Sequence, residues 1–75
     1  MMSDVRLKKD IEPVGEQDGH NLYAYRYKNE DSSAPKQIGV MAQEVERTRP
    51  DAVIETPIGK AVNYGRLFGL GALGA

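Results

Sequence analysis

Few side chains in this 75-residue chain are suited to chemistry, because it has no cysteine and a single histidine, His20. The lack of cysteine excludes disulfides and thiolate metal ligands, and one histidine cannot build a multi-histidine metal site. His20 lies close to Asp18, and together with Ser3 these are the residue types of a hydrolytic triad. A triad is defined by geometry, and a histidine in a turn region is usually solvated, so we expect no triad. The sequence predicts no cofactor and no metal.

Charge and hydropathy argue against two broad classes of partner. Ten Lys and Arg residues stand against eleven Asp and Glu residues, with the signs interleaved, for a formal net charge of −1. A phosphate backbone demands a basic stripe, which the sequence lacks, so we predict no binding of nucleic acid. The longest apolar and glycine-rich stretch, residues 67–75, is far shorter than the ~20 residues that cross a bilayer. No signal peptide is recognisable at the start, so we expect a soluble protein with no membrane partner.

The length leaves room for one domain, residues 1–75. A domain of this size buries only about 60% of the surface that its unfolded chain exposes, so its stability as a monomer is marginal. Small domains compensate with disulfides, a metal or oligomerisation, and the composition excludes the first and argues against the second. We therefore expect support from partner chains or from a larger parent protein.

Local patterns in the first half of the chain predict strands joined by turns. Residues 3–14 are highly charged, and the alternation of apolar and charged side chains over residues 5–8 suits a short strand or an extended arm. Asp18–Gly19 is a turn signal. Residues 22–28 are the clearest strand, since three aromatic side chains fall on one face at period two: Tyr23, Tyr25 and Tyr27. A polar loop at residues 29–35 follows.

The second half predicts one short helix among short strands. A short apolar run at 37–41 precedes a helix over residues 42–47. Pro50 ends this helix, because the residue before a proline is pushed out of the helical region. Residues 52–55 and 60–64 indicate two strands joined by a proline-to-glycine turn.

The tail from residue 65 onward has apolar side chains at helical spacing, and glycines interrupt it. The apolar side chains are Leu67, Phe68, Leu70 and Leu73, and the glycines are Gly65, Gly69, Gly71 and Gly74. Each interior glycine costs about 0.5–1 kcal/mol relative to alanine, so the helix persists only when packed on the domain or on copies of itself.

The predicted fold class is α+β, with a few short strands, one central short helix and a C-terminal helical or irregular tail. The predicted core consists of Leu7, Ile11, Leu22, Tyr25, Tyr27, Ile38, Val40, Val45, Val53, Val62, Tyr64 and Leu67.

Four blocks of sequence occur in a recognisable order: SDVRLKKDI at 3–11, YRYK at 25–28, IGVMAQEVE at 38–46, followed by Pro50, and VNYGRL at 62–67. Together they resemble the endosialidase-type intramolecular chaperone auto-processing domains at the C-termini of phage tailspikes and tail fibres. The blocks look like that family's opening signature, its tyrosine-rich strand, its Gly-x-x-Ala-Gln-Glu-Val helix ending at a proline, and its Val-x-Tyr-x-x-Leu entry to a C-terminal helix.

The resemblance implies a temporary chaperone that promotes trimerisation and assembly of the fibre or tailspike preceding it. The implied partners are further copies of the chain, as a homotrimer, and the phage tail fibre or tailspike protein. The implied location is the virion tail, or the host cytoplasm during phage assembly.

The resemblance also implies self-cleavage by a serine–lysine endopeptidase mechanism at the bond before the signature serine. Ser3 would be the nucleophile and Lys8 its general base, with Met2–Ser3 as the scissile bond. A serine hydroxyl needs a base, and a lysine serves when burial or nearby positive charge lowers its pKa. Charged neighbours of Lys8 act in both directions: Arg6 and Lys9 favour the neutral amine, Asp4 and Asp10 oppose it.

The chain departs from the family at both ends, since only Met1 and Met2 precede Ser3 and no long coiled coil follows residue 67. We therefore expect a short version of the domain, either a separately encoded remnant or an isolated domain. The alternative function is a non-catalytic structural component of a phage tail or virion with the same fold. The self-cleaving function predicts that chains beginning at Ser3 accumulate when a longer sequence is placed upstream. The structural function predicts that Ser3→Ala and Lys8→Ala leave assembly intact.

Overall fold

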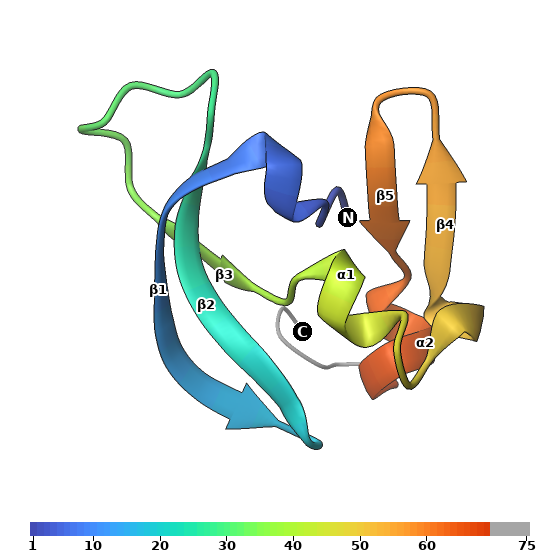
Figure 1. Cartoon of the computed structure of the whole chain (residues 1–75). Coiled ribbons are helices and arrows are strands. Elements are labelled where there is room, and N and C mark those ends of the chain that lie inside the picture. Colours follow the sequence, from blue (N-terminus) through green and yellow to red (C-terminus); the bar gives the residue numbers. More distant parts are fainter. Residues whose placement is uncertain (70–75) are drawn as a thin grey trace.

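The computed structural model describes residues 1–69, which form two small antiparallel sheets and several short helices (Figure 1). The first sheet has the order β1 (Lys8–Gln17), β2 (His20–Tyr27), β3 (Gln37–Gly39). The second is the hairpin β4 (Val53–Thr56) and β5 (Gly59–Val62). The α-helices are α1 (Ala42–Val45) and α2 (Tyr64–Phe68), and the 3-10 helices are η1 (Val5–Leu7) and η2 (Pro50–Ala52). The predicted α+β class is confirmed.

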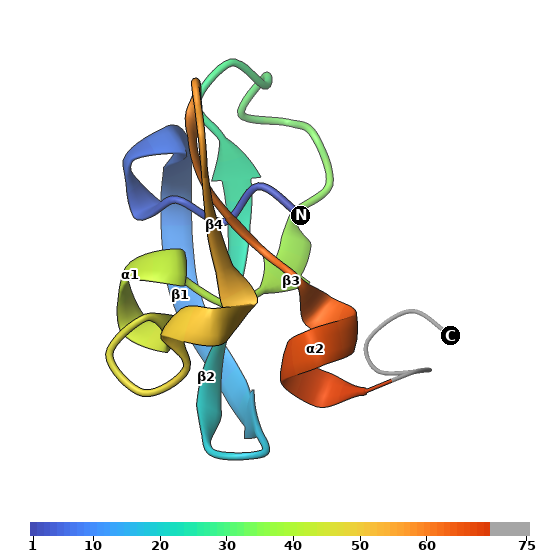
Figure 2. The same cartoon turned by 90° about the vertical axis from the view of Figure 1, so that its right-hand side faces the viewer.

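The start of the chain lies between the two sheets, with α1 beside it (Figures 1 and 2). It pairs with β5 in the antiparallel sense. The Met1 amine donates to Val62 O at 2.9 Å and Val62 N donates to Met1 O at 2.8 Å. Ser3 N donates to Lys60 O at 3.0 Å. Residues 1–3 therefore extend the β4–β5 hairpin at its β5 edge.

The strand or extended arm predicted over residues 3–14 has different bounds in the structure, where β1 runs from Lys8 to Gln17. Asp4 caps the turn of η1, so the strand begins at Lys8. Pro13 does not end the strand, because β1 pairs only on its β2 side and shifts register around this residue. The predicted turn at Asp18–Gly19 is confirmed, with φ of 52° and 81° at its two residues.

The helical segments are shorter than predicted. The helix expected over 42–47 ends at Val45, and Pro50 begins η2 as its first residue, a position where the missing N–H costs nothing. Tyr64 belongs to α2 and not to the strand predicted over 60–64, because the Asn63 side chain accepts from Arg66 N at 2.9 Å and caps a helix there. The turn between the last two strands is confirmed.

The C-terminal helix α2 includes Leu67 and Phe68 and is followed by Gly69, whose φ is 86°. Leu70, Leu73, Gly71 and Gly74 lie outside the described residues. Within residues 1–69, no helix has the length and apolarity that a membrane crossing requires.

The core lies where α1, η2, β5 and α2 meet. It consists of Val40, Ala42, Val45, Ala52, Val62 and Leu67, with Leu22, Val53, Tyr64 and Phe68 packed against it. Tyr25 is fully buried as well, whereas Leu7 and Tyr27 are half-buried. Most of the predicted core is therefore confirmed.

Two predicted core residues are wrong. Ile38 is 55% exposed, because it points to the face of β3 opposite Gly39, and Gly39 faces the rings of Tyr25 and Tyr64. Ile11 is 39% exposed, because it falls in the register shift between Lys9 and Glu12. Alternation predicts the inward face only where the pairing is regular.

Candidate active site

Ser3 and Lys8 are both buried, with exposed fractions of 0% and 3%. Ser3 is fixed through its backbone: besides the bond to β5, its carbonyl accepts from Ala42 N at 2.8 Å, where α1 begins. Lys8 Nζ donates to Val40 O at 2.8 Å. The serine backbone and the lysine ammonium therefore lie against the same junction between β3 and α1.

Lys8 lies in surroundings that disfavour its charge. Burial lowers the pKa of Lys8 from 10.5 to about 8, and the negative charge of Asp4 opposes this shift. The cause is burial, not the neighbouring positive charges expected from the sequence. The ammonium still has partners, because Nζ lies 3.8 Å from the centroid of the buried Tyr25 ring and donates to Val40 O. A lysine with this pKa is neutral in a substantial fraction of molecules at about pH 8, and the neutral amine can take up a proton.

Asp4 connects the turn at residues 3–7, the signature turn, to the rest of the domain. Its carboxylate is 1% exposed and accepts from Arg6 N, Nε and Nη2 at 2.9, 3.0 and 2.7 Å. It also accepts from Gln43 Nε2 in α1 at 2.7 Å and from Lys60 N in β5 at 3.0 Å. The Arg6 side chain, with these further donors, holds the pKa of the Asp4 carboxyl well below its usual range despite burial. The residue after Ser3 is thereby anchored to two elements.

Gln43 lies in the candidate site, although the sequence predicted only Ser3 and Lys8 as site residues and gave Gln43 no catalytic role. Its side-chain oxygen accepts from Val5 N at 2.9 Å while its nitrogen donates to Asp4. Gln43 belongs to the Ala-Gln-Glu-Val block of the sequence. Nothing in that block indicates that its side chain would bind the turn at residues 3–7.

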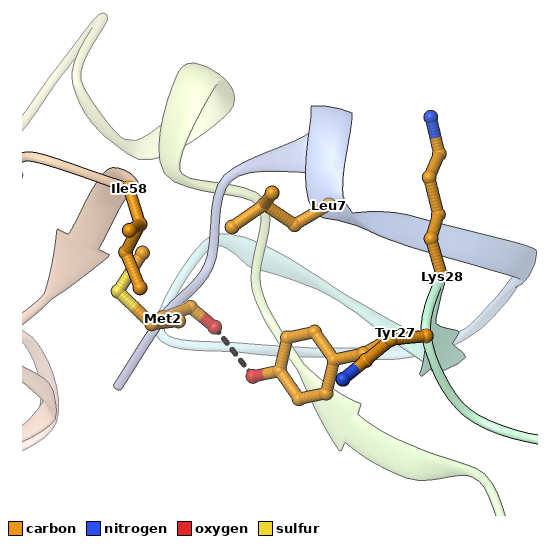
Figure 3. A pocket seen from close by; sticks show the side chains of 6 residues that line it. Met2, Leu7, Tyr27, Lys28 and Ile58 are labelled. Atoms are coloured by element: carbon orange, nitrogen blue, oxygen red, sulfur yellow. Dashed lines mark hydrogen bonds between the residues drawn. The ribbon is translucent and has the colours of Figure 1, made fainter.

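The carbonyl oxygen of Met2, in the bond before Ser3, accepts a hydrogen bond from Tyr27 Oη at 2.6 Å (Figure 3). Tyr27 is the last residue of β2 and pairs directly with Lys8 of β1. Sequence reasoning placed Tyr27 in the core through its alternation with Tyr23 and Tyr25. The alternation gave no indication that its hydroxyl would meet this carbonyl.

An open hollow of about 520 Å³ adjoins the Met2 side chain. Figure 3 shows apolar side chains of Met2, Leu7 and Ile58 around it, with Tyr27 and Lys28 on the opposite side. The hollow therefore lies beside the residue that precedes Ser3.

The serine hydroxyl is hydrogen-bonded to a nearby backbone carbonyl and not to a candidate base. Ser3 Oγ donates to Met1 O at 3.1 Å, and no hydrogen bond joins Ser3 to Lys8 or His20 in residues 1–69. His20 is half-buried rather than solvated, and its ring packs edge-on against Phe68 with centroids 5.8 Å apart. The residue types of a triad are therefore present without its geometry. The described part of the chain also contains no group of three acidic, histidine or cysteine side chains placed to hold a metal.

Comparison with known proteins places most of this site in one family. The family model described as "Chaperone of endosialidase" matches residues 3–54, more than half of the chain. The match includes Ser3, Lys8, Tyr27 and Gln43, and it ends before β5 and before the block at 62–67. No curated protein and no solved structure matches the chain.

Proposed function

The chain belongs to the chaperone-of-endosialidase family, and from this premise we propose that it promotes trimerisation and assembly of a phage tail fibre or tailspike and severs its own Met2–Ser3 bond. Residues 1–75 act as one short chaperone domain in this proposal. Its partners are two further copies of itself and the fibre or tailspike protein. It acts in the virion tail or in the host cytoplasm during phage assembly.

One observation supports the cleavage step above the others: a buried lysine with a lowered pKa shares the β3–α1 junction with a buried serine. Lysines are rarely buried without a charged partner, because removing an ammonium from water is costly. In this site the ammonium is stabilised by one carbonyl and one aromatic ring, which replace only part of its hydration. The site therefore favours the neutral amine more than water does. A neutral amine is the form that a general base requires.

The proposed reaction is an acyl transfer within the chain. Ser3 Oγ bonds to the carbonyl carbon of Met2, its proton passes to the neutral Lys8 amine, and the carbonyl electron pair moves onto oxygen. The C–N bond then breaks, and Lys8 returns the proton to the Ser3 nitrogen. This leaves an ester between Met2 and Ser3 Oγ. Water hydrolyses the ester to a Met2 carboxylate and restores the serine hydroxyl.

The reaction requires the Ser3 hydroxyl to turn from Met1 O toward Lys8. The neutral amine has two N–H groups and a lone pair, so Lys8 can keep donating to Val40 O while accepting from Ser3.

A second candidate function is a non-catalytic structural component of the phage tail or virion. It is favoured by the hydrogen bond of Ser3 Oγ to Met1 O, which uses the hydroxyl for local structure. In this role Asp4, Gln43 and Lys8 stabilise the turn and take no part in chemistry.

The two functions are separated by placing a folded reporter protein upstream of Met1 and measuring the masses of the products. The proposal predicts accumulation of a domain fragment beginning at Ser3. Ser3→Ala and Lys8→Met stop the cut, whereas the matched substitutions Ser32→Ala and Lys9→Met leave it intact. Recovery of only uncut fusion from the unaltered sequence, with its domain folded, leaves the structural function as the better account.

The trimer is tested separately by native mass spectrometry of the full chain and of its Ser3→Ala variant. The proposal predicts a trimer in both, since assembly does not need the hydroxyl. A monomer in both, at concentrations where the domain is folded, contradicts the chaperone role proposed for this chain.

A further inference from the structure

The Met2 carbonyl oxygen is positioned for chemistry by its place in the sheet. Met1 and Val62 exchange two hydrogen bonds, and Met2 lies opposite Ala61 in the next, non-hydrogen-bonded position. In antiparallel pairing, the carbonyl at such a position points away from the neighbouring strand. The Met2 carbonyl therefore points away from β5 and toward the first sheet, where its hydrogen-bond donor within residues 1–69 is Tyr27 Oη at 2.6 Å.

We propose that the Tyr27 hydroxyl is a catalytic residue that stabilises the oxyanion formed on Met2 during self-cleavage. The inference rests on the self-cleavage proposed above and identifies a third group in its site. When Ser3 Oγ adds to the carbonyl carbon, negative charge develops on the oxygen that Tyr27 already contacts. A donor aimed at that oxygen before the reaction stabilises the transition state without reorganisation.

Tyr27 is held in place from three directions. It pairs with Lys8 across the β1–β2 ladder, so the proposed base and the proposed oxyanion donor come from opposite positions of two neighbouring strands. Its ring packs edge-on against Tyr25 with centroids 5.4 Å apart, and Tyr25 is fully buried. The hydrogen bond to Met2 is the third constraint (Figure 3). A donor fixed in this way retains its geometry through the reaction.

The neighbouring phenol strengthens Tyr27 as a donor. The two hydroxyl oxygens of Tyr25 and Tyr27 are 3.5 Å apart. Because Tyr27 gives its one proton to Met2, Tyr25 is the donor in this second contact, and it shares its own proton between Tyr27 Oη and Met1 Sδ, which lies 3.9 Å away. A hydroxyl that accepts a hydrogen bond while donating another is polarised toward its acceptor, so the chain of contacts runs from Tyr25 through Tyr27 to the reacting carbonyl.

The test measures the rate of cleavage of the upstream fusion for Tyr27→Phe beside the matched control Tyr23→Phe. Tyr23 lies on the same strand and also donates one hydrogen bond, at 2.7 Å, but to Glu44 and not to the scissile bond. We expect Tyr27→Phe to slow cleavage by about 10²–10³-fold, as the loss of one oxyanion donor does in other acyl-transfer sites. Tyr23→Phe is expected to keep the rate of the unaltered chain.

A pH profile separates a chemical role from a structural one. In Tyr27→Phe, the plateau rate falls while the midpoint of the profile stays near the Lys8 value of about 8, because the lysine remains buried. If the substitution only loosened the site, solvent would reach Lys8 and the midpoint would rise toward that of an ordinary lysine. Thermal melting of both variants reports on folding in the same samples.

The outcomes distinguish this inference from the proposed function. An unaltered fusion that is never cut overturns the self-cleavage, and the role of Tyr27 with it. An unaltered fusion that is cut, with Tyr27→Phe cut equally fast, overturns the oxyanion role alone. A slow Tyr27→Phe with a raised midpoint also overturns it, in favour of a structural role.

Discussion

The signature turn and the first residue of β1 bury one acidic and one basic side chain, Asp4 and Lys8, and their surroundings act on them differently. Asp4 receives five donors from three segments, so its charge is well supported and its pKa is lowered. Lys8 has one carbonyl acceptor and the face of one ring. Burial therefore lowers the pKa of Lys8 and leaves its charge easy to lose. The Asp4 carboxylate therefore stays charged and holds the turn in place, whereas Lys8 can change its protonation state near pH 8.

This difference predicts how the stability of the domain depends on pH. The folded pKa of Lys8 is about 8 and its ordinary value is 10.5, so between these two pH values the unfolded chain binds more protons than the folded chain. The free energy of unfolding should therefore rise with pH across this window, by up to about 3 kcal/mol. Below pH 8 the lysine is charged in both states, and its contribution is constant there.

Urea denaturation at intervals from pH 7 to pH 10 measures this contribution, with Lys8→Met as the comparison. Methionine retains an apolar stem beside Tyr25 but does not titrate, so the difference between the two chains isolates Lys8. Burial raises the pKa of the Tyr25 phenol in both chains and cancels in the difference. Parallel pH dependences for the two chains would contradict a lowered Lys8 pKa.

At the level of residues, the family resemblance predicted Ser3 and Lys8 as site residues, and the structure buries both. It did not identify Gln43 or Tyr27 as site residues. Their roles depend on which backbone groups approach them across 38 and 25 positions of the sequence. Contacts of that range follow from the register of strands and the packing of α1, and no local pattern encodes them.

At the level of elements, the period-two tyrosines correctly predicted β2, and proline and glycine signals correctly predicted two turns. The errors occur where an element is short or irregular. Register shifts in β1 expose Ile11, and the three residues of β3 are too few to show which face Ile38 occupies. A capping side chain ended one predicted strand early, because Asn63 begins α2.

The junction of β3 with α2 leads to a prediction at this scale. A Cβ added at Gly39 would lie 2.5 Å from Tyr64 Oη, and that oxygen accepts a hydrogen bond from Val40 N at 2.9 Å. Gly39→Ala must displace the tyrosine or the strand, and we expect it to lower the free energy of unfolding by about 1–3 kcal/mol.

Gly15→Ala in β1 is the matched control for Gly39→Ala. No atom lies within 4 Å of a Cβ added at Gly15, so we expect its stability to stay the same or to rise by up to about 1 kcal/mol. Urea denaturation of the two variants measures both. Equal stabilities would mean that Tyr64 is not held against Gly39.

At the level of the whole molecule, the first residue of the chain pairs with a residue 61 positions later. The N-terminal segment closes the gap between the two sheets, joining β5 through its backbone and β2 through Tyr27. The bond proposed for cleavage is therefore also part of what holds the domain together. Cutting it removes Met1 and Met2, and with them two hydrogen bonds with Val62, one from Tyr27 and one from the Ser3 hydroxyl. Two longer contacts to the methionine sulfurs, from the hydroxyls of Tyr25 and Thr56, are lost as well.

A chain that begins at Ser3 should consequently be less stable than the full chain. The three bonds that join Met1 and Met2 to Val62 and Tyr27, at about 0.5–1.5 kcal/mol each, amount to about 1.5–4.5 kcal/mol, a large share of the stability of a small domain. Cleavage also leaves a free amine at Ser3, a buried position in the intact chain. Urea denaturation of the two chains measures the loss, and hydrogen exchange at the Val62 amide should quicken in the shorter one, because its acceptor is Met1 O.

The control for this comparison is a chain with one glycine added before Met1, which retains every bond and should keep the stability of the full chain. Equal stabilities of the full chain and the chain that begins at Ser3 would show that Met1 and Met2 do not contribute to the free energy of unfolding. The predicted loss has a functional consequence for a chaperone that acts once. In the proposed function, the cut leaves Met1 and Met2 on the upstream protein, attached to β5 and to Tyr27 by hydrogen bonds alone. Release of the upstream protein then requires only that these non-covalent bonds break.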